Sequence, residues 1–217
     1  MRFTLSVLFL LIYFFVPRSG LQAGDIDSLQ NVLKHENRPS ERLEVLLDLS
    51  WQLKNSDTQL AWDHATEALG IAHAISDLSQ KAMALKHMGV IRWYESDLEG
   101  SRNFLDSARY YFQLTGHQEG LADIHNNLGL NYHIEGSFGD ALQHYEKALQ
   151  LRQELRDTAG MTISLVNMGV LYHELGDQHK AIDLYNRTVS LLQQTKDEAR
   201  LGDTYLNVGN YYLEEEQ

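Results

Sequence analysis

The chain of 217 residues contains no cysteine, which excludes disulfides, thiolate nucleophiles and cysteine-bound zinc. Acidic residues outnumber basic ones by 30 to 18, and the net charge of −12 argues against the basic surface that nucleic-acid binding requires. The two prolines, Pro17 and Pro39, leave the rest of the chain free to form long helices, because only proline removes the N–H that a helix interior needs.

The N-terminus differs in character from the rest of the chain. Residues 3–16 form an apolar run that follows Arg2 and is interrupted by only two hydroxyl residues. As a helix this run would be about 21 Å long, which is shorter than the roughly 30 Å hydrocarbon core of a membrane. It therefore predicts a signal peptide over residues 1–23, cleaved after Ala23, with cleavage after Leu21 or an uncleaved anchor as alternatives. We expect an exported, periplasmic or extracellular protein with no membrane span after the signal is removed.

Residues 24–40 are expected to cap the N-terminal end of the structure. Apolar residues recur at helical spacing from residue 25 to residue 36, which predicts one short helix. Residues 35–40 contain Pro39 and are expected to form the linker that follows it.

A period of forty residues organises the chain from residue 41 to residue 217. Gly129 is followed by Gly169 and Gly209 and preceded by Gly89, each at an interval of forty. A fixed period of this length is typical of an array of stacked repeats, in which each unit contacts its neighbours. The predicted repeats are about 41–77, 78–117, 118–157 and 158–197, with a partial repeat at 198–217.

Each full repeat is expected to be a pair of antiparallel helices. Gly136 and Gly176 stand where a helix would end in a left-handed residue, a conformation that glycine adopts without a Cβ clash. Asp57, Asp97 and Asp177 stand where a side-chain oxygen could cap the next helix. The predicted pairs are 41–54 with 58–75, 79–95 with 98–114, 119–135 with 138–155, and 158–175 with 178–194.

The glycines in the middle of the first helices need a structural reason, because glycine costs up to about 1 kcal/mol there relative to alanine. Close contact between the two helices of a pair would supply it. We therefore predict that Gly129 packs against Ala141 and Ala148.

The order Asn127-Leu128-Gly129 with Tyr132, followed by a turn glycine and then by Ala141, Tyr145 and 148–149, resembles the tetratricopeptide repeat in its forty-residue form. This resemblance covers residues 41–217. It implies an all-α fold, a right-handed superhelical solenoid of antiparallel helix hairpins, whose first helices line a concave groove that binds a protein or peptide. The first copy departs from the pattern with Leu49 in place of the glycine, and the second has Arg92 in place of the tyrosine, which leaves the local packing there open.

A ladder of asparagines two residues before each glycine is the candidate binding site. A carboxamide offers both a donor and an acceptor, which suits it to hold a peptide backbone. The resemblance implies that these asparagines reach into the groove, and the alternative is that each ties one repeat to the next through a backbone carbonyl. The candidate residues are Asn127, Asn167 and Asn207, with Asn126, His133 and His173 as possible neighbours in the groove.

Other chemistry finds little support in the sequence. His133 and His173 lie one period apart, so equivalent helices would hold them about 8 to 10 Å apart or more, too far to share a zinc ion. No phosphate-binding glycine loop or nucleophile elbow is present. We therefore expect no catalytic residue, metal or cofactor.

The sequence favours an exported, non-enzymatic scaffold that binds a protein or peptide in its groove. The alternative is the extracytoplasmic sensor region of a transmembrane signalling protein, such as a histidine kinase or a transcriptional regulator. The repeat at 198–217 has only its first helix. We take this as a sign of a fragment or of a sensor arm that continues into, or associates with, such a protein.

Overall fold

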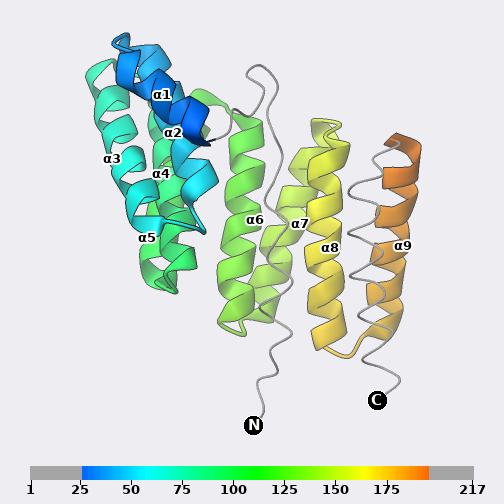
Figure 1. The fold of residues 1–217 in the computed structure, drawn as a ribbon. Coiled ribbons are helices and arrows are strands. Elements are labelled where there is room, and N and C mark those ends of the chain that lie inside the picture. The colour runs from blue at the N-terminus through cyan, green and yellow to red at the C-terminus, as the bar shows by residue number, and fades with distance from the viewer. Residues whose placement is uncertain (1–25, 196–217) are drawn as a thin grey trace. The chain divides into compact units, whose positions relative to one another are not determined.

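The computed structural model describes residues 26–195, and every regular element in that range is an α-helix (Figure 1). Residues 26–151 and 152–195 belong to two compact units, and each is described by itself. The expected signal peptide, the partial repeat and Asn207 lie outside the described residues. The helices are α1 (Ile26–His35), α2 (Pro39–Leu53), α3 (Thr58–Ala74), α4 (Leu78–Tyr94), α5 (Leu98–Thr115), α6 (Gln118–Ile134), α7 (Phe138–Glu154), α8 (Thr158–Glu174) and α9 (Gln178–Thr195).

The helix boundaries agree with the predicted pairs to within two residues. The largest difference is at the start of α2, which begins at Pro39 instead of residue 41. Proline is tolerated in the first turn of a helix, because the N–H that it lacks has no partner there in any case. The predicted linker is therefore shorter than residues 35–40.

The predicted caps and turns are confirmed. Asp57, Asp97 and Asp177 each accept a hydrogen bond from the backbone N–H three residues later, at 3.0, 2.8 and 3.2 Å. Gly136 and Gly176 have φ angles of 76° and 77°, in the left-handed region. At these positions the helices therefore begin or end where the local sequence specifies.

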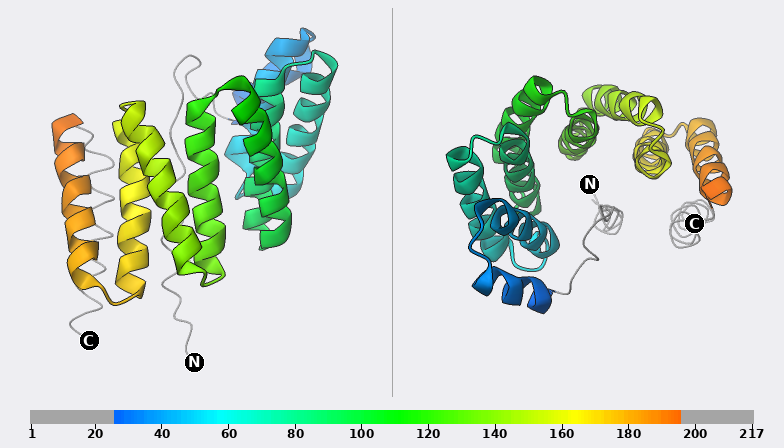
Figure 2. Two further views of the ribbon diagram at one scale, coloured as in Figure 1. Left: turned by 180° about the vertical axis from the view of Figure 1, so that it is seen from behind. Right: turned by 90° about the horizontal axis from the view of Figure 1, so that it is seen from above.

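Within residues 26–151, the first helices of successive repeats, α2, α4 and α6, lie side by side, and α3 and α5 form a second row (Figure 2). Leu105 and Phe112 of α5 pack with Ile124 and Leu128 of α6 in the largest apolar cluster. The short helix α1 packs on α2, with Leu29 in a cluster that includes Leu49. The core thus runs between neighbouring helices instead of forming one centre.

In the second and third repeats, the contact between the two helices of the hairpin is built on a glycine and a large side chain. A Cβ added to Gly129 would lie 2.5 Å from Cε1 of Tyr145, and the same contact to Leu105 Cγ at Gly89 would be 2.8 Å. The prediction that Gly129 packs against Ala141 and Ala148 is therefore wrong about the partner. The glycine makes room for a buried aromatic ring, and not for a second small residue.

Both departures from the repeat pattern are compensated locally. Where the third repeat has Gly129 and Tyr145, the first has Leu49 and Ala65, and both of these residues are fully buried. The large residue is on the first helix of the first repeat, whereas it is on the second helix of the third repeat. In the second repeat, the Arg92 guanidinium carbon lies 4.1 Å from the centre of the Trp62 ring, where the ring attracts a cation.

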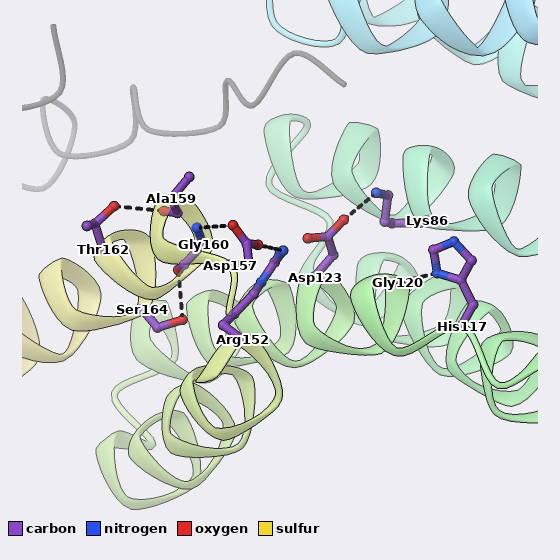
Figure 3. Close-up of polar contacts among 10 residues, drawn as sticks. All are labelled: Lys86, His117, Gly120, Asp123, Arg152, Asp157, Ala159, Gly160, Thr162 and Ser164. Carbon is purple, nitrogen blue, oxygen red and sulfur yellow. Dashed lines mark hydrogen bonds and ion pairs between the residues drawn. The ribbon is translucent and has the colours of Figure 1, made fainter. Parts of the chain in front are cut away.

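In residues 152–195, α8 and α9 form a hairpin with the same kind of contact, in which a Cβ on Gly169 would meet Cε1 of Tyr185 at 2.7 Å. Arg152 and Asp157 form an ion pair at the start of α8, and Asp157 also accepts a hydrogen bond from the Gly160 N–H at 2.9 Å (Figure 3). None of the helices within residues 26–195 has the length and apolarity needed to cross a membrane.

Candidate functional site

The first helices of the second and third repeats are joined by an ion pair. Nζ of Lys86 on α4 lies 2.7 Å from Oδ2 of Asp123 on α6 (Figure 3). The Lys86 side chain is 7 % exposed and that of Asp123 is 35 % exposed, so the ammonium group depends on this partner for its charge balance. We call the surface that carries Trp51, Lys86, Asp123, Asn126 and Asn127 the first-helix face.

An aromatic and cationic cluster lies at the α2 end of the first-helix face. The ring centres of Trp51 and His87 are 5.1 Å apart, and Nζ of Lys54 lies 4.2 Å from the Trp51 ring centre. Burial lowers the pKa of Lys54 to about 8. Burial, reinforced by the charges of Lys86 and Lys54, also holds the pKa of His87 well below its usual range, so His87 is neutral.

His87 occupies the position of the asparagine ladder in the second repeat, forty residues before Asn127. Its side chain packs on Trp51, and its Nδ1 atom is buried without a hydrogen-bond partner among residues 26–195. The histidine thus supplies packing where the later repeats carry a carboxamide, and the ladder does not extend to α4.

Asn127 lies on α6 and is 5 % exposed. Its backbone carbonyl accepts a hydrogen bond from Nδ2 of Asn131 at 2.9 Å. Its own carboxamide has no hydrogen-bond partner within the part of the chain that the structure describes. The geometry therefore gives Asn127 no role as a tie between repeats.

The tie between repeats is made by Asn131, a residue that the sequence analysis did not single out. Asn131 is fully buried, and its Nδ2 also donates to Oγ of Ser101 on α5 at 3.1 Å. The corresponding positions of the second and fourth repeats hold Ile91 and Leu171, which are fully buried as well. A polar residue at a position that is apolar in the other copies was the signal that could have identified it.

Asn126 and His133 lie on the same helix as Asn127 but in different surroundings. Asn126 is 6 % exposed and forms part of the first-helix face. Nδ1 of His133 lies 3.4 Å from the Tyr145 hydroxyl, and its ring meets that of Phe138 edge-on at 5.8 Å. Both of these partners belong to α7, so His133 contacts the second helix of its own hairpin.

Asn167 and His173 are half-buried residues of α8, in the unit formed by residues 152–195. Both residues already take part in interactions of their own. Asn126, Asn127 and His133 thus lie on α6, with His133 turned to α7, and Asn167 and His173 lie on α8.

The site contains no arrangement typical of catalysis among residues 26–195. No group of three metal-ligating side chains occurs in this range. The charged and aromatic groups of the first-helix face are engaged in an ion pair, ring contacts and a helix-end hydrogen bond from Lys54 Nζ to the Trp51 carbonyl at 2.9 Å. Such a surface can bind a ligand by hydrogen bonds, cation–π contacts and packing.

Helical hairpins at a spacing of forty residues define an all-α solenoid of stacked repeats. The family model described as the tetratricopeptide repeat matches residues 80–154 and 120–194. The chain belongs to the tetratricopeptide repeat family.

Several solved structures share this fold. BtubC from P. vanneervenii is 23 % identical, with a TM-score of 0.69 over 86 % of this chain and 78 % of its own. A Rap protein complexed with Competence and Sporulation Factor is 16 % identical, with a TM-score of 0.76 over 82 % of this chain and 51 % of its own. A putative kinesin light chain from Podosopora anserina is 15 % identical, with a TM-score of 0.56 over 79 % and 87 %. No curated protein sequence matches the chain.

Proposed function

We propose that this protein is a non-enzymatic scaffold that binds an extended protein or peptide segment along its first-helix face. The observation that carries the proposal is the carboxamide of Asn127, which is nearly covered and yet has no hydrogen-bond partner within residues 26–195. The amide atoms of Asn127 are not among the fully covered unpaired polar atoms, so they remain open at the surface to a ligand. A peptide backbone would pair with them, because it offers both an N–H and a carbonyl.

Low exposure makes the proposed contact effective. Water competes little with a hydrogen bond at a position that is 5 % exposed, so one carboxamide can contribute substantially to affinity and orientation. Asn126 lies beside Asn127 on α6, and Asn167 and Asn207 occupy the same place in later repeats. We propose that Asn127 holds the backbone of the ligand in this way, and that Asn167 and Asn207 are further candidates for such a contact, each within its own repeat.

The division of roles between Asn127 and Asn131 allows a sharp test. Peptides selected for binding to the full chain from a displayed random library serve as the probe, and their affinity is measured for each variant. Asn127→Ala is expected to weaken binding at least tenfold while the melting temperature stays unchanged. Asn103→Ala, an exposed asparagine on α5, is the matched control and should bind as the parent protein does.

Two results would overturn the proposal. Unchanged peptide affinity in Asn127→Ala would show that the carboxamide does not hold the ligand. A large loss of thermal stability in that variant would indicate that Asn127 has a structural role instead.

We further propose that the scaffold works outside the cytoplasm, either alone or as the sensor region of a transmembrane signalling protein. The export proposal rests on the apolar run at residues 3–16, and the sensor alternative on the likeness to a Rap protein that carries a bound factor. Cell fractionation combined with N-terminal sequencing tests export. A mature protein that begins at Gly24 supports it, and a cytoplasmic protein that retains Met1 contradicts it.

A further inference from the structure

Two histidines of the third repeat approach each other closely across its hairpin. Nδ1 of His125 on α6 lies 3.1 Å from Nδ1 of His144 on α7, and the ring centres are 5.2 Å apart. This pair plays no part in the proposed peptide site. From this geometry we propose that His125 and His144 form a two-imidazole binding site for Cu²⁺.

The separation of the two nitrogens fits a tetragonal metal ion better than a tetrahedral one. With metal–nitrogen bonds of about 2.1 Å, two atoms 3.1 Å apart subtend an angle of about 95° at the metal. A tetrahedral ion would require about 3.4 Å between the same atoms. An angle near 90° is the one between neighbouring ligands of a tetragonal ion, the geometry that Cu²⁺ prefers, and Cu²⁺ also binds nitrogen ligands most tightly among the divalent ions of its row.

The two ligands are held in place by their surroundings. The His144 ring stacks on Tyr132 with the ring centres 5.3 Å apart and an angle of 24° between the planes. The next residue, Tyr145, lies against Gly129, one turn of α6 after His125. The contact between the two helices therefore fixes their distance at the height of the histidine pair. Metal binding requires the two rings to turn, so that the Nδ1 atoms that now face each other across the hydrogen bond both point at the ion.

The protonation state of the pair suits a metal ligand, because only neutral imidazole has a free lone pair. In the metal-free pair, one Nδ1 carries the hydrogen that the other accepts. Metal binding moves that hydrogen to Nε2 of the same ring as a change of tautomer, which leaves both Nδ1 lone pairs for the ion and releases no proton.

The charges around the pair do not complete the site, and those that act on His125 are cationic. Arg109 and Lys147 are the nearby cations, and Asp106 and Asp140 are the nearby anions. Arg109 is itself paired with Asp106 at 2.9 Å. No third metal-ligating side chain joins the two histidines within residues 26–195, so water fills the remaining coordination positions.

Copper titration of the untagged full chain, followed by electron paramagnetic resonance, tests the site. The first equivalent of Cu²⁺ is expected to show two coordinated nitrogens, and His125→Gln and His144→Gln should each weaken its binding at least tenfold. The chain has ten histidines, so His179→Gln, which removes an exposed histidine of α9, is the matched control and should leave that affinity unchanged. Circular dichroism checks that each variant remains helical.

A second measurement does not depend on any variant. Substoichiometric Cu²⁺ should broaden the NMR signals of the His125 and His144 rings in the parent protein before those of the other histidines. The proposal is overturned if the broadening begins elsewhere, or if the two variants bind the first equivalent as tightly as the parent protein does.

Discussion

The ring of Tyr145 lies where a side chain on Gly129 would begin, with Cε1 of the ring 2.5 Å from the place of the missing Cβ. Tyr145 is fully buried, so the ring has no free space into which it could move. We expect Gly129→Ala to lower the free energy of unfolding by about 1 to 3 kcal/mol through overpacking, in spite of the better helix propensity of alanine.

Urea denaturation measures this change, and the chain provides a matched control. Gly70 also lies inside a helix, α3, but no atom lies within 4 Å of a Cβ placed there. Gly70→Ala should therefore stabilise the protein by up to about 1 kcal/mol. If both alanine variants gain stability, the close contact at Gly129 does not exist in solution.

The buried tie between Asn131 and Ser101 predicts an unequal effect of two substitutions. Asn131→Ala removes both hydrogen bonds of the carboxamide and leaves a cavity, so it should cost about 1 to 3 kcal/mol of unfolding free energy. Ser101→Ala should cost less, because the Asn131 Nδ2 keeps its bond to the Asn127 carbonyl. A double-mutant cycle measures the coupling, and additive losses would contradict the tie.

Substitutions at the two residues of the ion pair, Lys86 and Asp123, should also differ in how much unfolding free energy they cost. Asp123→Asn leaves the ammonium group of Lys86 almost covered and without its counter-charge, so we expect a loss of about 1 to 2 kcal/mol. Lys86→Met leaves a carboxylate that can still reach water, and should cost less than 1 kcal/mol. Equal losses in urea denaturation would show that burial of the lysine is not the deciding factor.

His87 should make stability depend on pH. Its pKa in the folded protein lies well below the ordinary value of 6.5, because burial disfavours the charged ring. The unfolded chain therefore binds the proton more readily, and stability is lost as the pH falls below about 6.5. The loss should be at most about 1.4 kcal/mol for each pH unit.

His87→Phe keeps a ring against Trp51 but cannot titrate, and should make the melting temperature depend less steeply on pH below 6.5. Part of the dependence should remain, because burial also lowers the pKa of His64, His125 and His144. An identical pH profile for His87→Phe and the parent protein would show that the imidazole does not resist protonation.

The sequence predicted the fold because its signals are local and repeated. Caps such as Asp97 and turn residues such as Gly136 act within four residues of their own position, and each prediction could be checked against three other copies. The period of forty residues then identified the solenoid.

The partners of individual side chains could not be predicted in the same way. The approach of His125 to His144 and the bond from Asn131 to Ser101 depend on how one helix is rotated against another. A repeat motif read along the chain does not specify that rotation. The prediction of the partner of Gly129 was wrong for the same reason, because Ala141, Tyr145 and Ala148 all lie on one face of α7 at helical spacing.

The first repeat places its large residue, Leu49, on the first helix and its small residue, Ala65, on the second, whereas the third repeat has Gly129 on the first and Tyr145 on the second. This reversal restricts how such repeats can evolve. A repeat cannot pass from one pair to the other by a single tolerated change, because the intermediate is either overfilled or hollow. Leucine facing tyrosine would crowd the contact between the helices, and glycine facing alanine would leave a cavity that costs several kcal/mol on the usual scale of such losses. A repeat of this chain therefore keeps the arrangement it inherited unless two helices change together.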